Sequence, residues 1–293
     1  MDKNSRYRTI KENYNQLGPL KASLQQLPGT HLSKADLAEL GIQLMQLSLY
    51  SKKAIGFEPR FCTPLSANKV DSLLQNFMND RESRGSKPDW PLPVPDIDSY
   101  FYEGLGIVSW FEKVLGCGYF PDSMLSSTEW MQQHGSTRQH RYLYEDFEGH
   151  HWATEAVLHA LPQAKRWRDP QPNAPEGEYR DTTKPKKPHI ASILIEDSVG
   201  DHRIFRSEMI VALARMREQM RIRENQDHYI FPVFVYTFSG RRARVVQVHF
   251  NGTCLVVRLT KWMDFEEENT NNIRLMLRWM MNTPIGDTSF HSL

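Results

Sequence analysis

The segment from residue 188 to residue 262 constrains the fold most, because apolar runs of strand length alternate there with one amphipathic helix. The run "HIASILIE", residues 189–196, is short and apolar, as is typical of a buried strand. The next stretch, "RIFRSEMIVALARMREQMRIREN", has apolar residues in helical register and arginines on the opposite side. Three strand-like runs follow, "YIFPVFVYTF", "RARVVQVHF" and "TCLVVRLTKW", separated at Ser239-Gly240 and Asn251-Gly252. Since Asn-Gly between apolar runs is a strong hairpin signal, we predict a mixed sheet with a crossover helix before a three-strand meander.

The rest of the chain is predicted to be mainly helical. Ser33 stands three residues before Asp36, as in a capping box, and a helical apolar pattern continues from Leu37 to Leu49. Helices are also expected at 67–79, 100–116, 149–161 and 268–283, with a short strand before the helix at 149. We therefore predict an α/β (α+β) fold with a helical N-terminal region over 1–80, a proline-rich linker or arm over 81–99, and a domain over 100–293 whose mixed sheet is flanked by helices.

Charge and composition limit the classes of function. The net charge of +1 means that any electrostatic site must be a local one. The N-terminus shows no apolar run of the kind that marks a secretory signal, and no window is apolar enough to cross a bilayer. Three widely spaced cysteines, Cys62, Cys117 and Cys254, favour reduced thiols. We expect a soluble, intracellular protein of the cytoplasm or nucleus that does not bind membranes.

One candidate site lies on the helix expected over 149–161. His151, Glu155 and His159 fall at i, i+4 and i+8 and would share one helix face, where they could supply metal ligands. The same two histidines could act as acid and base groups near neutral pH in a small-molecule (biosynthetic) enzyme. The alternative is a partly buried polar face with no ligand.

A second candidate site is the end of the strand at 189–196, where Glu196 and Asp197 are adjacent. Neighbouring strand residues point to opposite faces, so only one of the two can join a given site. Glu196 could combine with Asp181 and Glu155 to bind magnesium through oxygen ligands. The alternative is an ordinary strand end.

The order of these elements over residues 145–262 resembles the core of the PD-(D/E)XK nuclease superfamily, and the tail resembles uncharacterised fungal proteins with degenerate nuclease-like domains. The resemblance implies a restriction-endonuclease-like core with Glu155, Asp181 and Glu196 as catalytic metal ligands for Mg²⁺. It departs from the family at Arg180, where a proline normally precedes the second acid, and at Ser198, where the catalytic lysine normally stands. Lys184, Lys186 or Lys187 would have to replace that lysine, and Lys184 is one candidate catalytic residue.

Positive charge is concentrated in the C-terminal half. From Arg203 to Lys261 the chain has eleven lysines and arginines but four acids. Arg217 and Arg221 share a helix face, and Arg241, Arg242 and Arg244 surround one hairpin turn, so these five are candidates for contacts with nucleic-acid phosphates. The alternative is a solvated helix face and a charged turn that protects a sheet edge.

Taken together, these features favour a degenerate nuclease-like protein that binds nucleic acid or a protein partner without efficient cleavage. An active metal-dependent nuclease with an atypical site and the acid-base enzyme are the two alternatives. Nucleotide-binding glycine motifs and a GxSxG nucleophile elbow do not occur in the sequence.

Overall fold

A computed structural model describes residues 2–49, 61–83, 144–147, 150–159, 187–266 and 270–290, together with helical residues at 103–104, 106–108, 110–111 and 114. Within these ranges no helix combines the length and the apolar character needed to cross a membrane.

A mixed sheet forms the centre of the molecule. Its strand order is β2-β10-β9-β8-β6-β5-β4, with β11 attached to β9. The pairs β6–β8 and β2–β10 are parallel and the others are antiparallel. The strands are β2 (Ile42–Gln46), β4 (Tyr144–Phe147), β5 (His150–His159), β6 (Ile190–Glu196), β8 (Val233–Ser239), β9 (Arg242–Phe250), β10 (Leu255–Leu259) and β11 (Met263–Asp264). The predicted mixed sheet is confirmed.

The C-terminal elements follow the sequence prediction closely. Helix α7 (Arg206–Arg221) connects β6 to the parallel strand β8, and β8, β9 and β10 form the expected meander. Gly240 and Gly252 take φ values of 55° and 95° at the two hairpin turns. Glycine adopts this left-handed region without the steric cost that a Cβ brings, which explains why both hairpins could be located from the sequence.

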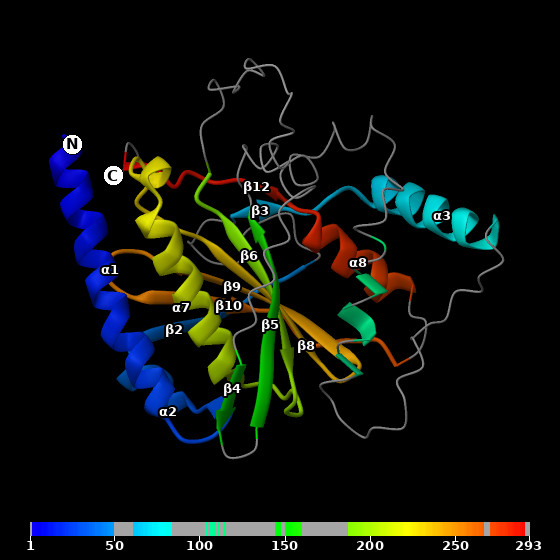
Figure 1. The fold of residues 1–293 in the computed structure, drawn as a ribbon, viewed down its shortest axis with the longest axis horizontal. Helices are drawn as coiled ribbons and strands as arrows, with labels where there is room; N and C mark the ends of the chain where they lie inside the picture. Colours follow the sequence, from blue (N-terminus) through cyan, green and yellow to red (C-terminus); the bar gives the residue numbers. More distant parts are fainter. Residues whose placement is uncertain are drawn as a thin grey trace, which may run out of the picture.

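Two long helices cover one face of the sheet. Helix α1 (Lys3–Gln26) is capped at its N-terminus by Asp2, whose carboxylate accepts hydrogen bonds from the N–H groups of Asn4 and Ser5. It lies alongside α7 (Figure 1), and Leu17 and Leu24 belong to the same buried core as Met216 on α7. The short helix α2 (Lys34–Glu39) and the 3₁₀ turn η2 (Arg223–Asn225) follow α1 and α7, respectively.

The ends of these two helices fix their relative direction. Arg206, at the start of α7, donates to the carbonyl oxygen of Leu27 just after α1, with a distance of 2.8 Å between nitrogen and oxygen. At the opposite end, Arg6 forms an ion pair of 2.7 Å with Asp227. The helices are therefore antiparallel. The small sheet β1–β7, formed by β1 (His31–Leu32) and β7 (Ile204–Phe205), joins the chain segments at the first of these ends.

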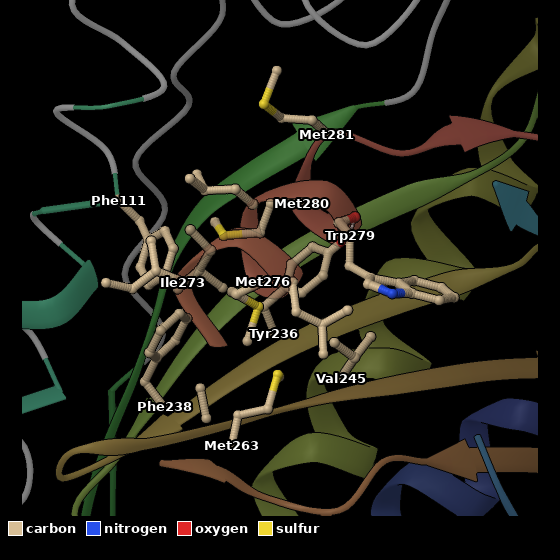
Figure 2. Packing of buried hydrophobic residues seen from close by; sticks show 14 of the residues in the cluster. Phe111, Tyr236, Phe238, Val245, Met263, Ile273, Met276, Trp279, Met280 and Met281 are labelled. Atoms are coloured by element: carbon tan, nitrogen blue, oxygen red, sulfur yellow. Dashed lines mark hydrogen bonds between the residues drawn. The ribbon is translucent and has the colours of Figure 1, made fainter. Parts of the chain in front are cut away.

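The other face of the sheet carries α8 (Thr270–Met280), α3 (Ala67–Ser83) and the helical residues of 103–114. Figure 2 shows methionine and aromatic side chains of α8 packed against Tyr236 and Phe238 of β8. The Tyr236 hydroxyl donates to the carbonyl oxygen of Trp279 at 2.5 Å and accepts a hydrogen bond from the Asn282 amide. A third pair of strands, β3 (Cys62–Thr63) and β12 (Thr283–Pro284), joins the segments that flank these helices.

The N-terminal region departs from the all-helical prediction for residues 1–80. The capping box of Ser33 and Asp36 is present and α3 lies where a helix was expected. However, the helix after Ser33 ends at Glu39, and residues 42–46 form β2 instead of continuing it. Gly41, with φ of 64°, separates the two elements. Hydrogen bonding to β10 determines the conformation here, because the apolar pattern alone fits either a strand or a helix.

The first 80 residues pair with later parts of the chain in three sheets: β2 belongs to the central sheet, and β1 and β3 each form a separate two-stranded sheet. Strands β1, β2 and β3 pair with β7, β10 and β12, respectively. The expected linker over 81–99 lies outside the described residues, apart from the last residues of α3.

The helix predicted over 149–161 is also wrong, since residues 150–159 form β5. This strand pairs with β4 on one side and β6 on the other, with a bulge between Glu155 and Val157. Alanine, leucine and glutamate give the segment a helical propensity, but pairing on both edges outweighs a preference of a few tenths of a kcal/mol per residue.

Candidate functional site

Glu196, the central acid of the predicted metal site, is the last residue of β6 and its side chain is fully buried. Its carboxylate accepts a hydrogen bond from the hydroxyl of Ser207, in the first turn of α7. The positive end of the α7 dipole favours a negative charge at this position. The carboxylate therefore interacts with the N-terminus of α7 inside the protein.

The backbone register separates Glu196 from Glu155. Trp152 lies directly opposite Glu196, whereas Glu155 lies opposite Ile193. Three residues along a strand correspond to about 10 Å. The structure thus does not bring these two backbone positions together. Asp181 and Lys184 lie outside the described residues, so the magnesium site with Glu155, Asp181 and Glu196 stays a prediction.

The alternative metal site with His151, Glu155 and His159 depended on a helix that is not present. On a helix, residues four positions apart are about 6 Å from each other, whereas on a strand they are about 13 Å apart. The three residues belong to β5, with His151 opposite Asp146 and His159 opposite Ile190. Among the described side chains, no group of three histidines, cysteines or acids is placed to hold a metal ion.

A buried ion pair joins β9 to the first turn of α7, and no pattern in the sequence predicted it. Arg244 donates from Nε and Nη2 to the carboxylate of Glu208, at 2.8 Å and 2.6 Å. Both side chains have no exposed surface. The same carboxylate accepts the backbone N–H of Phe205 at 2.8 Å and so caps α7. One acid thus holds both the start of the helix and an arginine of β9.

Arg244 was predicted as part of a nucleic-acid-binding turn, and the structure places it in the interior instead. Its guanidinium lies 4.4 Å from the ring centroid of Trp262 and 5.2 Å from that of Phe205. Alternate residues of a strand face opposite sides, and position 244 faces the side covered by α7. Arg242 is exposed and Arg241 is partly exposed. These two remain surface cations.

The loop between β6 and β7 closes over the buried pair. Gly200 packs so closely on Trp262 that an added Cβ would lie 2.3 Å from a ring carbon. The indole N–H donates to the carbonyl oxygen of Asp201 at 2.5 Å. The Asp201 carboxylate binds Arg203 at 2.6 Å and lies 3.7 Å from His31. Burial lowers the pKa of His31, although the nearby Asp201 opposes that shift.

A groove runs along the outer surface between α1 and α7, and we call it the α1/α7 groove. One part has a volume of about 580 Å³, and the other, towards the start of α1, has about 520 Å³. Tyr14 and Arg221 line both parts. The charged residues that line the groove are Lys11, Lys21, Arg215, Arg217, Glu218 and Arg221. Five cations therefore face one acid.

The predicted arginines Arg217 and Arg221 are thus brought together with residues that the sequence analysis missed. Tyr7, Lys11, Tyr14 and Lys21 come from α1, some two hundred residues earlier in the chain. Their spacing of four, three and seven residues places them along one face of a helix. That spacing could have predicted a basic and aromatic stripe on α1, but it does not indicate that α7 lies beside this stripe.

Arg217 forms the floor of the groove. Its guanidinium lies 4.1 Å from the centroid of the Tyr14 ring, and it covers Gly18, where an added Cβ would be 3.4 Å from Nη2. Within the described ranges it forms no hydrogen bond or ion pair. Arg215, in contrast, is bonded to Glu218 at 2.8 Å. The groove therefore contains the guanidinium of Arg217, which is held by contacts with Tyr14 and Gly18 and not by a carboxylate of the described residues.

A second hollow of about 610 Å³ lies at the carboxyl ends of β6 and β8. It contains Arg241 and Arg242 together with Glu103 and Glu266. Arg241 lies 3.4 Å from Glu103 and donates to the backbone oxygen of Glu266 at 3.2 Å. Because two cations face two acids, this hollow has no net charge to select a polyanion.

Comparison with known proteins adds no relative. No protein-family model, curated protein or solved structure gave a significant match to this chain.

Proposed function

We propose that this protein binds nucleic acid through a nuclease-like fold and does not cleave it efficiently. The proposal depends on which residues lie beneath α7 and which lie on its outer surface. The acid that a nuclease would use, Glu196, is buried beneath the first turn of the helix. The arginines that would contact phosphates, Arg217 and Arg221, lie on its outer surface in the α1/α7 groove.

The position of Glu196 argues against metal-dependent cleavage. Magnesium binds carboxylate oxygens at about 2 Å and keeps several waters, so its ligands need access to solvent. A fully buried carboxylate that accepts a hydrogen bond from Ser207 does not offer that access. Ser198 stands where the resemblance places a lysine, and loss of that cation removes stabilisation of the transition state.

The order β6–α7–β8 supports the restriction-endonuclease-like core as part of the proposal. It reproduces the sequence of a strand ending in an acid, an amphipathic helix and a further strand on which the resemblance depends. The resemblance fails for Glu155, which belongs to a strand instead of the expected helix.

The test uses the full chain with fluorescein-labelled single-stranded DNA, duplex DNA and RNA, in Mg²⁺, in Mn²⁺ and in EDTA. We expect binding without metal-dependent cleavage, with an affinity that falls as salt rises because phosphate contacts release counterions. Cleavage that needs metal and is lost in Glu196→Gln, but not in the exposed control Glu266→Gln, would establish an active nuclease and refute the proposal.

The same experiment separates the remaining hypotheses. A chain that binds no nucleic acid contradicts the proposal and favours a protein partner or the acid-base enzyme. That enzyme would require His151 and His159, so a double replacement of these residues should abolish any small-molecule turnover.

A further inference from the structure

We infer that the α1/α7 groove binds a single strand of nucleic acid, with its phosphates on the arginines of α7 and a base against Tyr7. The inference rests on the proposed function and deepens it by naming the site and the form of the ligand. It depends on the charge of the groove, on the way Arg217 is held and on the aromatic side chains of α1.

Charge identifies the ligand as a polyanion. The whole chain carries a net charge of +1, yet five cations and one acid line the groove. The single acid, Glu218, already binds Arg215. A local excess of this kind attracts phosphates and is strongest at low salt.

The geometry of Arg217 prepares it for a phosphate. The guanidinium lies over the Tyr14 ring, 4.1 Å from its centroid, which limits its movement. A planar guanidinium offers its donors in a fork that matches phosphate oxygens. Gly18 lies directly under the guanidinium, since an added Cβ there would be 3.4 Å from Nη2, at ordinary contact distance. Arg221 stands one helical turn further along and is exposed, so a second phosphate can be bound next to the first.

Tyr7 supplies a surface for a base. Its side chain is 56% exposed, which is unusual among the large aromatic residues that the structure describes. It lines the groove beside Lys11 and Arg221. Stacking of bases on aromatic rings next to a cationic track is the common mode of binding to single strands.

The length of the groove sets the size of the ligand. From Tyr7 to Lys21 the helix rises about 21 Å. A stacked strand advances about 3.4 Å per nucleotide, so the groove spans roughly six nucleotides. A duplex keeps its bases paired inside and cannot present one to Tyr7, which is why the arrangement favours a single strand.

The experiment measures fluorescence anisotropy of a labelled twelve-nucleotide DNA strand, of the RNA of the same sequence and of the DNA duplex. The variants are Tyr7→Ala and Arg221→Ala, both at exposed positions. Arg274→Ala on α8 is the matched control, because it removes an exposed arginine from the opposite face of the sheet. Circular dichroism checks that each variant is folded.

We expect Tyr7→Ala to weaken single-strand binding by at least about fivefold, the lower range for loss of one stacked base. Arg221→Ala should reduce the slope of log affinity against log salt by about 0.7, the value for one phosphate contact on a single strand. Arg274→Ala should leave both quantities unchanged.

Three results would overturn the inference. If nucleic acid binds and neither Tyr7→Ala nor Arg221→Ala weakens it, the groove is not the site, although the proposed function stands. If the duplex binds more tightly than the single strand, the ligand is assigned wrongly. If no nucleic acid binds, the proposed function falls together with the inference.

Discussion

Replacing Glu208 with glutamine tests the account of the buried polar network most directly. Glutamine keeps the shape of the side chain and an oxygen that can still cap Phe205, but it removes the charge opposite Arg244. Because both side chains have no exposed surface, Arg244 would be left as a buried cation without a counter-charge. Removing one partner of a buried ion pair typically costs 3–5 kcal/mol, so we expect the free energy of unfolding to fall by about 4 kcal/mol.

Urea unfolding followed by tryptophan fluorescence measures this loss, and a thermal melt should show a drop of roughly 6–10 °C at about 2 °C per kcal/mol. The double variant Glu208→Gln/Arg244→Met removes both charges. Methionine keeps an apolar stem against Trp262, so the double variant should recover most of the loss. Glu266→Gln, at an exposed position, is the control and should change stability by less than about 0.5 kcal/mol. A loss below about 1 kcal/mol in Glu208→Gln would refute the reasoning, since it would mean that Arg244 reaches solvent or another acid.

Two further predictions concern stability. Burial lowers the pKa of His189 to about 3, so above pH 6.5 this group is neutral in both states, whereas below that pH the unfolded chain takes up a proton that the folded chain does not. Stability should therefore fall by about 1.4 kcal/mol per pH unit from this group, or about 2 kcal/mol between pH 6.5 and pH 5; unfolding at several pH values should show a shallower slope in His189→Gln, and equal slopes would contradict the assignment. Gly200→Ala should cost about 1–3 kcal/mol because the new Cβ would lie 2.3 Å from the Trp262 ring. The neighbouring Val199→Ala, at a position that is 53% exposed, should be nearly neutral in the same thermal melt.

The sequence was sufficient to predict elements whose signals are local. The hairpins at Gly240 and Gly252 were predictable because their turns need left-handed glycines, and α7 because its apolar face repeats with helical period. The strands β2 and β5 were mistaken for helices because their conformation depends on pairing with β10, β4 and β6. Pairing between distant segments leaves little trace in a short window of sequence.

The candidate site shows the same division. The shared face of Arg217 and Arg221 follows from helical spacing, so it could be predicted. The partners from α1 could not be assigned, because only the packing of α1 on α7 brings Tyr14 against Arg217. Arg244 was placed wrongly because three arginines near one turn look alike in sequence, whereas Glu208 of α7 binds only the one that faces it.

The parallel pairing of β2 with β10 has a consequence for how the protein is made. Ile42 pairs with Leu255. Strand β2 therefore has no strand to pair with until β10 has been synthesised. At about 5–20 residues per second, the ribosome needs roughly 10–40 s to cover that interval. Helix α1 also lacks its packing partner α7 during most of this period, so the apolar side chains of Leu17 and Leu24 stay exposed to solvent. The nascent N-terminus should therefore be a substrate for chaperones.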